Sequence, residues 1–333
     1  MGFAEIIGHE RPIRVLRTMI TAGRLPHALL LAGPAGVGKK TMALALAAAV
    51  NCLAPVEGDA CGACPACGKV RRGVHPDVEV FELEGKARII TIANVRELRT
   101  KIAFRPYEGR MKVFLMPGAE RMQEEAANAL LKTLEEPPPQ SLLILTTTEE
   151  AGLLPTIVSR CLKVTLAPLP LRLVEDWLAR VRGISGPRAR LLASMSGGCL
   201  GRAADLGPDQ VFSQRDRLVR ELARLGPRDL EGGLAWAAEL AGDEEVRPLV
   251  LSLLRFWFRD LMILAGAKGR PVVNEDLRPR LEQTAAGRRA EDFIAALREI
   301  DRAEDALNRF IRPELVLENL VLALADMGKV GSG

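Results

Sequence analysis

The chain has 333 residues, of which 48% are hydrophobic and 26% charged, a balance typical of ordinary globular proteins. At about 100–200 residues per domain, this length predicts two or three domains, each able to bury a core. The formal net charge of +4 is too small to indicate nucleic-acid binding by itself. No run reaches the roughly 18 apolar residues of a membrane helix, and the N-terminus shows no secretory signal, so we expect a cytoplasmic protein.

Strand-like and helix-like segments alternate through the first half of the chain. The strand-like runs are short, rich in Val, Ile and Leu, and bounded by turn residues; they span 27–32, 77–83, 112–116, 141–148 and 162–166. Helical periodicity occupies 12–22, 39–52, 92–104 and 123–136. Because continuous apolar runs suit strands buried on both faces of a parallel sheet, we predict an α/β domain of βαβ units over residues 1–167.

The pattern changes after Pro168-Leu169-Pro170, where helical periodicity continues with few strand signals. We therefore expect a small helical lid at 168–207 and an all-α collar domain at 208–333. An aromatic content of only 4% disfavours a surface for single-stranded nucleic acid, so the larger aromatic side chains of this part are expected in its cores. They are Trp177, Trp236, Phe256, Trp257 and Phe258.

A glycine-rich loop, Gly33-Pro34-Ala35-Gly36-Val37-Gly38-Lys39, follows the first strand-like run and opens a helix. In such a phosphate-binding loop the glycines let backbone N–H groups converge on phosphate oxygens, and the lysine reaches the outer phosphates. The full motif continues with Ser or Thr, whose hydroxyl binds Mg²⁺, but here Lys40 holds that position and Thr41 follows. Since one residue turns a side chain by about 100° around a helix, Thr41 does not simply replace the missing hydroxyl.

The acidic strand end of an ATPase, which holds Mg²⁺ and activates water, is also altered. After the third strand-like run, Pro117 and Gly118 stand where Asp and Glu are needed, and Glu120 comes too late. Neither Pro nor Gly can coordinate a metal or accept a proton, so the two losses predict a site that binds ATP or ADP without hydrolysis. One alternative is that working acids lie elsewhere, at Asp77 and Glu79, although these begin a strand rather than end it.

Four of the six cysteines are crowded together, because Cys52, Cys61, Cys64 and Cys67 are separated by only eight, two and two residues. In a reducing cytosol this spacing favours a metal site over disulfides. Four thiolates make a closed tetrahedral Zn²⁺ site with no open position for chemistry, so we predict a structural zinc module at 52–67. Free thiols and an iron–sulfur cluster are the alternatives.

Several stretches resemble the AAA+ subunits of bacterial DNA polymerase III clamp loaders. They are residues 6–10, 23–28, the phosphate loop, the four-cysteine insertion and, most specifically, 128–138. The resemblance is good over residues 5–207 and weak beyond. It implies a P-loop AAA+ domain with a parallel sheet and zinc insertion, a helical lid, and a collar for oligomerisation.

Two arginines take their expected roles from this resemblance. Ser159-Arg160-Cys161 resembles the arginine-finger motif, so Arg160 is expected to act in trans on the phosphates at a neighbour's ATP site. The segment 197–203 resembles the second sensor of the lid, which implies that Arg202 approaches the nucleotide. An ordinary surface role for Arg160, and a bridge between lid and base for Arg202, are the alternatives.

The family has two close branches, the tau/gamma type with a working ATPase and the delta-prime type, which often lacks hydrolysis. Lys40, Pro117 and Gly118 favour the delta-prime branch, with an active tau/gamma-like ATPase as the alternative. The implied partners are tau/gamma and delta subunits in a hetero-pentameric clamp loader, the sliding clamp, and primer-template DNA. The implied function is clamp loading in replication, within the DNA polymerase III holoenzyme, a DNA-directed DNA polymerase. A zinc-containing DNA-binding regulator is a further hypothesis, although no helix-turn-helix signature favours it.

Overall fold

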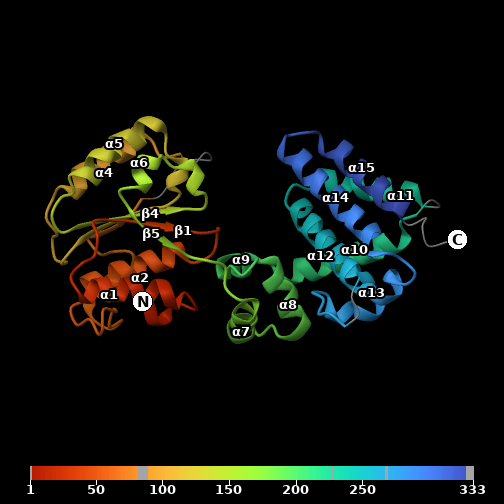
Figure 1. Cartoon of the computed structure of the whole chain (residues 1–333), viewed down its shortest axis with the longest axis horizontal. Coiled ribbons are helices and arrows are strands. Elements are labelled where there is room, and N and C mark those ends of the chain that lie inside the picture. The colour runs from red at the N-terminus through yellow and green to blue at the C-terminus, as the bar shows by residue number, and fades with distance from the viewer. Residues whose placement is uncertain (1, 82–88, 227–228, 267–268, 328–333) are drawn as a thin grey trace. The chain divides into compact units, whose positions relative to one another are not determined.

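The computed structural model describes residues 2–81, 89–226, 229–266 and 269–327. The chain divides into two compact units, and Figure 1 labels many of their elements. The first contains the residues up to Val174 together with Gly197–Ala204, and the second contains Glu175–Ser196 together with the residues from Asp205 onward. The segment 168–207, expected as a lid, is therefore shared between the two units.

The first unit is built on a parallel sheet of five strands in the order β2-β3-β4-β1-β5, which confirms the predicted fold class. The strands are β1 (Ala28–Ala32), β2 (Val78–Val80), β3 (Lys112–Met116), β4 (Ser141–Thr147) and β5 (Leu162–Thr165). Each lies within one of the predicted runs, of which residues 82–83 fall outside the described residues. Since parallel strands end at the same edge, the loops after β1, β3 and β4 come together there.

The first unit also contains the helices that cover both faces of this sheet, together with shorter ones. They are η1 (Phe3–Glu5), α1 (Glu10–Thr21), α2 (Lys39–Asn51), α3 (Pro65–Arg72), α4 (Ile92–Ile102), η2 (Ala119–Arg121), α5 (Glu124–Glu135), η3 (Glu150–Gly152), α6 (Pro155–Val158) and most of α9 (Leu200–Asp205). The short helix α3 was not among the predicted helices. Its signal in the sequence was Pro65, since proline is favoured at the first position of a helix.

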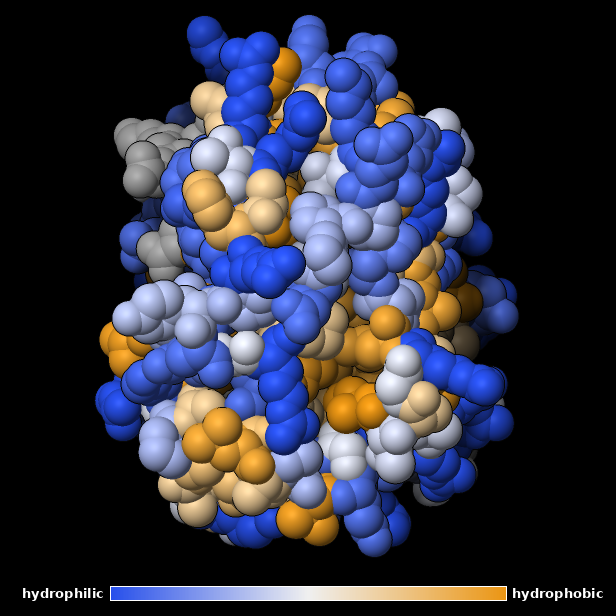
Figure 2. Space-filling model, turned by 90° about the vertical axis from the view of Figure 1, so that its left-hand side faces the viewer, coloured by the Kyte–Doolittle hydropathy of each residue, from blue (hydrophilic) through white to orange (hydrophobic). Residues whose placement is uncertain are grey.

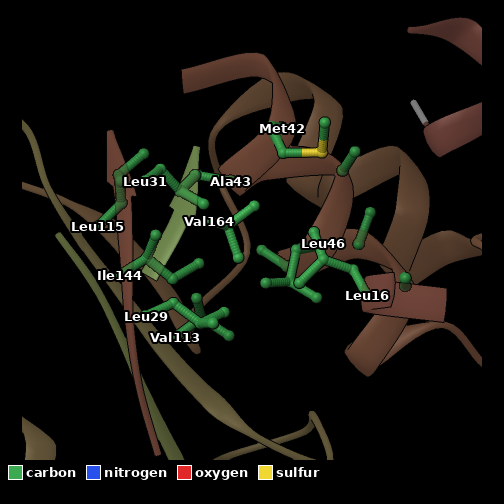
Figure 3. Close-up of a cluster of buried hydrophobic side chains, with 14 of the residues drawn as sticks. Leu16, Leu29, Leu31, Met42, Ala43, Leu46, Val113, Leu115, Ile144 and Val164 are labelled. Atoms are coloured by element: carbon green, nitrogen blue, oxygen red, sulfur yellow. The ribbon is translucent and has the colours of Figure 1, made fainter. Parts of the chain in front are cut away.

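The strands alternate their apolar side chains between two cores, as their burial on both faces requires. On one face, the strand side chains shown in Figure 3 pack toward α1 and α2; they are Leu29, Leu31, Val113, Leu115, Ile144 and Val164. On the other face, Leu30, Phe114, Leu143 and their neighbours pack with buried residues of α4 and α5. This double burial sets the sheet rigidly beneath the loops at its carboxyl edge.

The second unit contains helices joined by loops and has no strand among its described residues. It contains most of α7 (Leu171–Arg182), then α8 (Gly186–Met195), α10 (Pro208–Arg224), α11 (Leu230–Gly242), α12 (Val246–Gly266), η4 (Glu275–Leu277), α13 (Arg278–Ala285), α14 (Ala290–Asn308) and α15 (Pro313–Met327). Helix α12 packs along α14, and α11 along α15. All three tryptophans of the chain lie in this unit. Trp236 and Trp257 are buried there, and Trp177 is half-buried.

An ion pair between a buried arginine and a more exposed aspartate links two parts of the helical unit. Arg215 of α10, which is 7% exposed, donates two hydrogen bonds to the Asp276 carboxylate, at 3.0 and 2.7 Å. On the face drawn in Figure 2, hydrophilic residues predominate and hydrophobic ones gather in separate patches. Apolar residues on the surface are ordinary for a folded protein.

Candidate nucleotide pocket and metal centre

The phosphate loop joins β1 to α2 through glycines whose conformations other residues rarely adopt. The φ angles of Gly33, Gly36 and Gly38 are +155°, +76° and +110°. At Gly33 a Cβ atom would lie 2.3 Å from the carbonyl oxygen of Leu166, so the close approach of the segment after β5 also requires glycine there. The loop therefore has the backbone form that the motif predicted.

Lys39, the predicted phosphate-binding lysine, is half-buried at the start of α2. Its Nζ donates hydrogen bonds to the carbonyl oxygens of Gly33, at 2.5 Å, and Pro34, at 2.9 Å. Burial lowers the pKa of Lys39, and the negative charge of Glu120 opposes that effect. The loop carbonyls therefore use two of the three N–H donors of this ammonium group, which leaves one donor for a phosphate.

A pocket of about 410 Å³ lies beside Lys39, at the carboxyl ends of β3 and β4. Its lining includes three basic side chains against a single acidic one among the described residues, a surplus of positive charge that suits an anionic ligand. The lining residues are Lys39, Lys40, Val80, Phe81, Pro117, Gly118, Glu120, Arg121, Thr146 and Thr148. Thr41 is exposed on α2 and does not line this pocket.

Directly after β3, Pro117 and Gly118 line the pocket where an acid pair would bind magnesium. Gly118 has the left-handed conformation, with φ of +66°, and leads into η2. This turn brings Glu120 to the pocket, where its Oε1 accepts hydrogen bonds from the Thr148 hydroxyl, at 2.6 Å, and the Thr148 amide, at 3.3 Å. From its position after β3 in the sequence, Glu120 is expected to lie too far along the chain to reach the pocket. The glycine at position 118 was the sequence feature that could have indicated the turn, because glycine readily adopts the left-handed conformation.

The two acids considered as alternatives are engaged away from the pocket. Asp77 precedes β2, and its buried carboxylate accepts hydrogen bonds from the backbone amides of residues 107–109, at 2.6, 2.9 and 2.7 Å. Burial acts to raise the pKa of Asp77, but these three amides hold that pKa below its ordinary value. Glu79 contacts Lys101 Nζ at 2.6 Å. Both carboxylates therefore have structural partners, and neither lines the pocket.

Residues 197–204 pack directly on the phosphate loop. The amide of Gly201 donates a hydrogen bond of 2.8 Å to the carbonyl oxygen of Gly36. A Cβ at Gly36 would lie 2.7 Å from the Arg202 nitrogen, and a Cβ at Gly201 would lie 2.9 Å from the Gly36 Cα, so only two glycines allow this approach. Arg202, the predicted second-sensor residue, is therefore close to the loop in the chain, with its side chain exposed.

Arg160, the predicted finger, follows α6 and is exposed. Its Nη2 lies 2.8 Å from Glu135 Oε1, at the end of α5, and its Nη1 donates a hydrogen bond of 3.1 Å to the Thr156 carbonyl oxygen. Arg160 does not line the pocket described above. Burial raises the pKa of the neighbouring Cys161 to about 11, so this thiol stays protonated at neutral pH.

The four clustered cysteines converge as their spacing predicted. The Sγ atoms of Cys52, Cys61, Cys64 and Cys67 all lie within 4.8 Å of one another, and those of Cys52 and Cys64 are 3.9 Å apart. A tetrahedral zinc site with Zn–S bonds of about 2.3 Å needs sulfur–sulfur separations of roughly 3.8 Å. The amides of Cys61 and Cys64 donate hydrogen bonds to the sulfurs of Cys52 and Cys61, at 3.2 and 3.4 Å, and such bonds stabilise and orient thiolate ligands. The donor set therefore fits a tetrahedral metal ion.

The elements around this centre hold its ligands in place. Cys52 follows the last turn of α2, while Cys64 and Cys67 belong to the start of α3. Between them, the Asp59 carboxylate accepts hydrogen bonds from the amides of Phe3, at 2.7 Å, and Ala4, at 3.0 Å. The cysteine module is thus tied to the N-terminal turn as well as to the α/β core.

Comparison with known proteins places this architecture in a family. A family model described as "DNA polymerase III, delta subunit" matches residues 8–170. The delta-prime subunit of DNA polymerase III from Pseudomonas aeruginosa is 38% identical over 236 residues, covering 70% of each chain. The delta-prime subunit from Bacillus subtilis is 28% identical over 323 residues, covering 95% of this chain and 96% of the relative. The tau subunit from Escherichia coli is 32% identical over 258 residues, which cover 74% of this chain but only 40% of tau.

The parallel sheet, the phosphate loop and the helical C-terminal part define a P-loop protein of the AAA+ class. A four-cysteine module is inserted in its first unit. Within that class, the chain belongs to the delta-prime family of DNA polymerase III clamp-loader subunits. In the described part of the chain, no helix combines the length and apolar character needed to cross a bilayer.

Proposed function

We propose that this chain is a clamp-loader subunit that can hold a nucleotide in its phosphate loop but does not hydrolyse it. The observation that carries the proposal is the presence of Pro117 and Gly118 in the pocket, at the end of the strand where magnesium-binding acids are needed. Lys40 lines the same pocket and places a positive charge at the position of the missing hydroxyl. Without a metal and an activated water, a bound triphosphate has no route to cleavage in this pocket.

We further propose that Arg160 serves a neighbouring subunit as an arginine finger. Two features support this role: Arg160 is exposed, and it does not line its own chain's pocket. A guanidinium that reaches the γ-phosphate of a neighbour stabilises the charge that develops during transfer, an effect of about 10³–10⁵ in rate for known fingers. For Arg202 two roles are open. It contacts the nucleotide that the phosphate loop binds, or it joins residues 197–204 to that loop.

The names of the relatives support the proposed assembly. We infer that this chain has a helical lid at 168–207 and a collar for oligomerisation at 208–333. Through this collar it would join tau/gamma ATPase subunits and a delta subunit in a hetero-pentamer. This complex would load the sliding clamp onto primer-template DNA in the cytoplasm. The four cysteines would hold one structural Zn²⁺, which has no open coordination position and therefore supplies folding energy rather than chemistry.

Turnover by the purified chain tests the central claim. In a coupled assay with ATP and Mg²⁺, we expect phosphate release no faster than that of the Lys39→Ala variant, which lacks the phosphate-binding ammonium. Glu120 is the observation that favours the second candidate, a tau/gamma-like ATPase, because it brings one carboxylate into the pocket. Hydrolysis that requires both Mg²⁺ and Lys39 would establish that second candidate and exclude the first.

Reconstitution with the tau/gamma, delta and clamp subunits tests the finger. We expect Arg160→Ala to lower the DNA-stimulated ATPase rate of the complex while the complex still assembles, as judged by size-exclusion chromatography. Arg172→Ala removes another exposed arginine outside the proposed motif and serves as the matched control. Equal rates for the two variant complexes would remove Arg160 from the mechanism.

A further inference from the structure

Glu120 combines three properties that an ordinary surface glutamate lacks. It lines the pocket together with Lys39, Lys40 and Arg121, and it is the single acid among the described lining residues. Its Oε1 is held by the hydroxyl and the amide of Thr148. Its Oε2 is buried and makes no hydrogen bond to the described part of the protein. An ionised oxygen in that state is normally compensated by a nearby positive charge.

Lys39 lines the same pocket and supplies a positive charge there. The charge of Glu120 acts on Lys39 in the direction that keeps the ammonium protonated, against the effect of burial. Burial acts to raise the pKa of Glu120 as well, but the bonds from Thr148 hold that pKa below its ordinary value, so the carboxylate is ionised at neutral pH. The fold has thus placed a fixed negative charge beside the lysine that the motif reserves for the outer phosphates of a nucleotide.

We propose that Glu120 is a specificity-determining residue of this pocket, an internal anion that disfavours a nucleoside triphosphate relative to a nucleoside diphosphate. This inference rests on the proposed binding of nucleotide, and it adds which nucleotide the pocket retains. A terminal phosphate must approach Lys39 while the Glu120 carboxylate already lies near it, and two like charges within several ångströms repel each other strongly in a partly buried site. A diphosphate carries one phosphate fewer into this region and meets less of the repulsion.

The position of Glu120 is also held from the backbone side. A Cβ atom at Gly152 would lie 3.2 Å from the Glu120 Cβ, so η3 packs closely against the glutamate. Together with the Thr148 bonds, this contact leaves the carboxylate little freedom to turn away when a ligand arrives. The repulsion is therefore a permanent feature of the pocket.

Binding of ADP and ATP to the full chain tests this inference. Equilibrium dialysis is done in magnesium-free buffer without chelator, so that the nucleotide charges are unmasked and the cysteine centre keeps its metal. We expect the native chain to prefer ADP, and Glu120→Gln to strengthen ATP binding by about tenfold more than ADP binding, the effect of removing one nearby charge. Glu124→Gln, the same substitution at an exposed acid outside the pocket, should leave the ratio of the two affinities unchanged.

The outcomes separate this inference from the proposed function. An unchanged affinity ratio in Glu120→Gln, or no nucleotide binding by native and variant chains, would overturn the role of Glu120. Glu120→Ala provides a second neutral variant in case the glutamine chain folds poorly, and it should shift the ratio in the same direction. Hydrolysis of ATP by the native chain would instead refute the proposed function, while the comparison of affinities would still decide the role of Glu120.

Discussion

Asp77 offers a sharp test of how the α/β unit is held together. Its carboxylate accepts three hydrogen bonds from the amides of residues 107–109 and is only 1% exposed. Asp77→Asn preserves the shape of the side chain but leaves one acceptor oxygen. That oxygen can serve two of the amides, while the new NH₂ group faces the third.

The size of the effect follows from these three bonds. The two surviving bonds each lose roughly 1 kcal/mol, the difference between a charged and a neutral acceptor, and the orphaned amide costs about 1–3 kcal/mol. We therefore expect the free energy of unfolding of this unit to fall by about 3–5 kcal/mol. Because the pKa of Asp77 is lowered in the fold, its contribution is fully present above the pKa of the unfolded chain, about 3.9, and is lost as the pH falls through the lower folded value.

Urea unfolding followed by circular dichroism, with hydrogen exchange of the amides at 107–109, measures both the global and the local effect. Glu136→Gln makes the same kind of charge change at an exposed position and should shift stability by less than about 0.5 kcal/mol. Nucleotide binding should be unaffected by Asp77→Asn, since Asp77 does not line the pocket. Native-like stability and unchanged exchange in Asp77→Asn would refute the reasoning.

Three further substitutions probe other parts of the chain. Cys67→Ser should reduce bound zinc well below about one ion per chain, measured by elemental mass spectrometry, because one of four ligands is lost; full zinc content would exclude the tetrathiolate site. Gly201→Ala should cost about 1–3 kcal/mol, since the new methyl group would lie 2.9 Å from the Gly36 Cα; hydrogen exchange of residues 197–204 should rise, and unchanged exchange would contradict the tight packing. Asp276→Ala should destabilise the helical unit by about 1–3 kcal/mol in thermal unfolding, because it leaves the buried Arg215 without its bidentate partner; a native melting temperature would count against this pair.

The sheet and the cysteine centre could be predicted because both depend on local patterns. An apolar run such as 112–116 is short enough for a strand and is bounded by turn residues, and the structure has a strand at those residues. The spacing of Cys61, Cys64 and Cys67 is characteristic of ligand loops, and these thiols do converge with Cys52. In both cases, residues that are close together in the sequence are sufficient to predict the structure.

The features that escaped prediction depend on backbone conformation or on residues distant in sequence. Glu120 reaches the pocket because Gly118 adopts a left-handed conformation, which a count of positions after a strand does not include. Arg160 forms an ion pair with Glu135, which is 25 positions away in the chain, and no local sequence pattern predicts that contact. The assignment of Asp77 to a structural role likewise required knowing that residues 107–109 turn back toward it.

The placement of the tryptophan and tyrosine residues determines which part of this protein intrinsic fluorescence can monitor. All three tryptophans lie in the helical unit, whereas the α/β unit contains the single tyrosine, Tyr107. Indole fluorescence therefore follows the helices and is silent about the phosphate loop and the cysteines. A preparation with a collapsed pocket could still show a native emission spectrum, so a fluorophore introduced at an exposed site such as Phe104 is needed to watch that half of the protein.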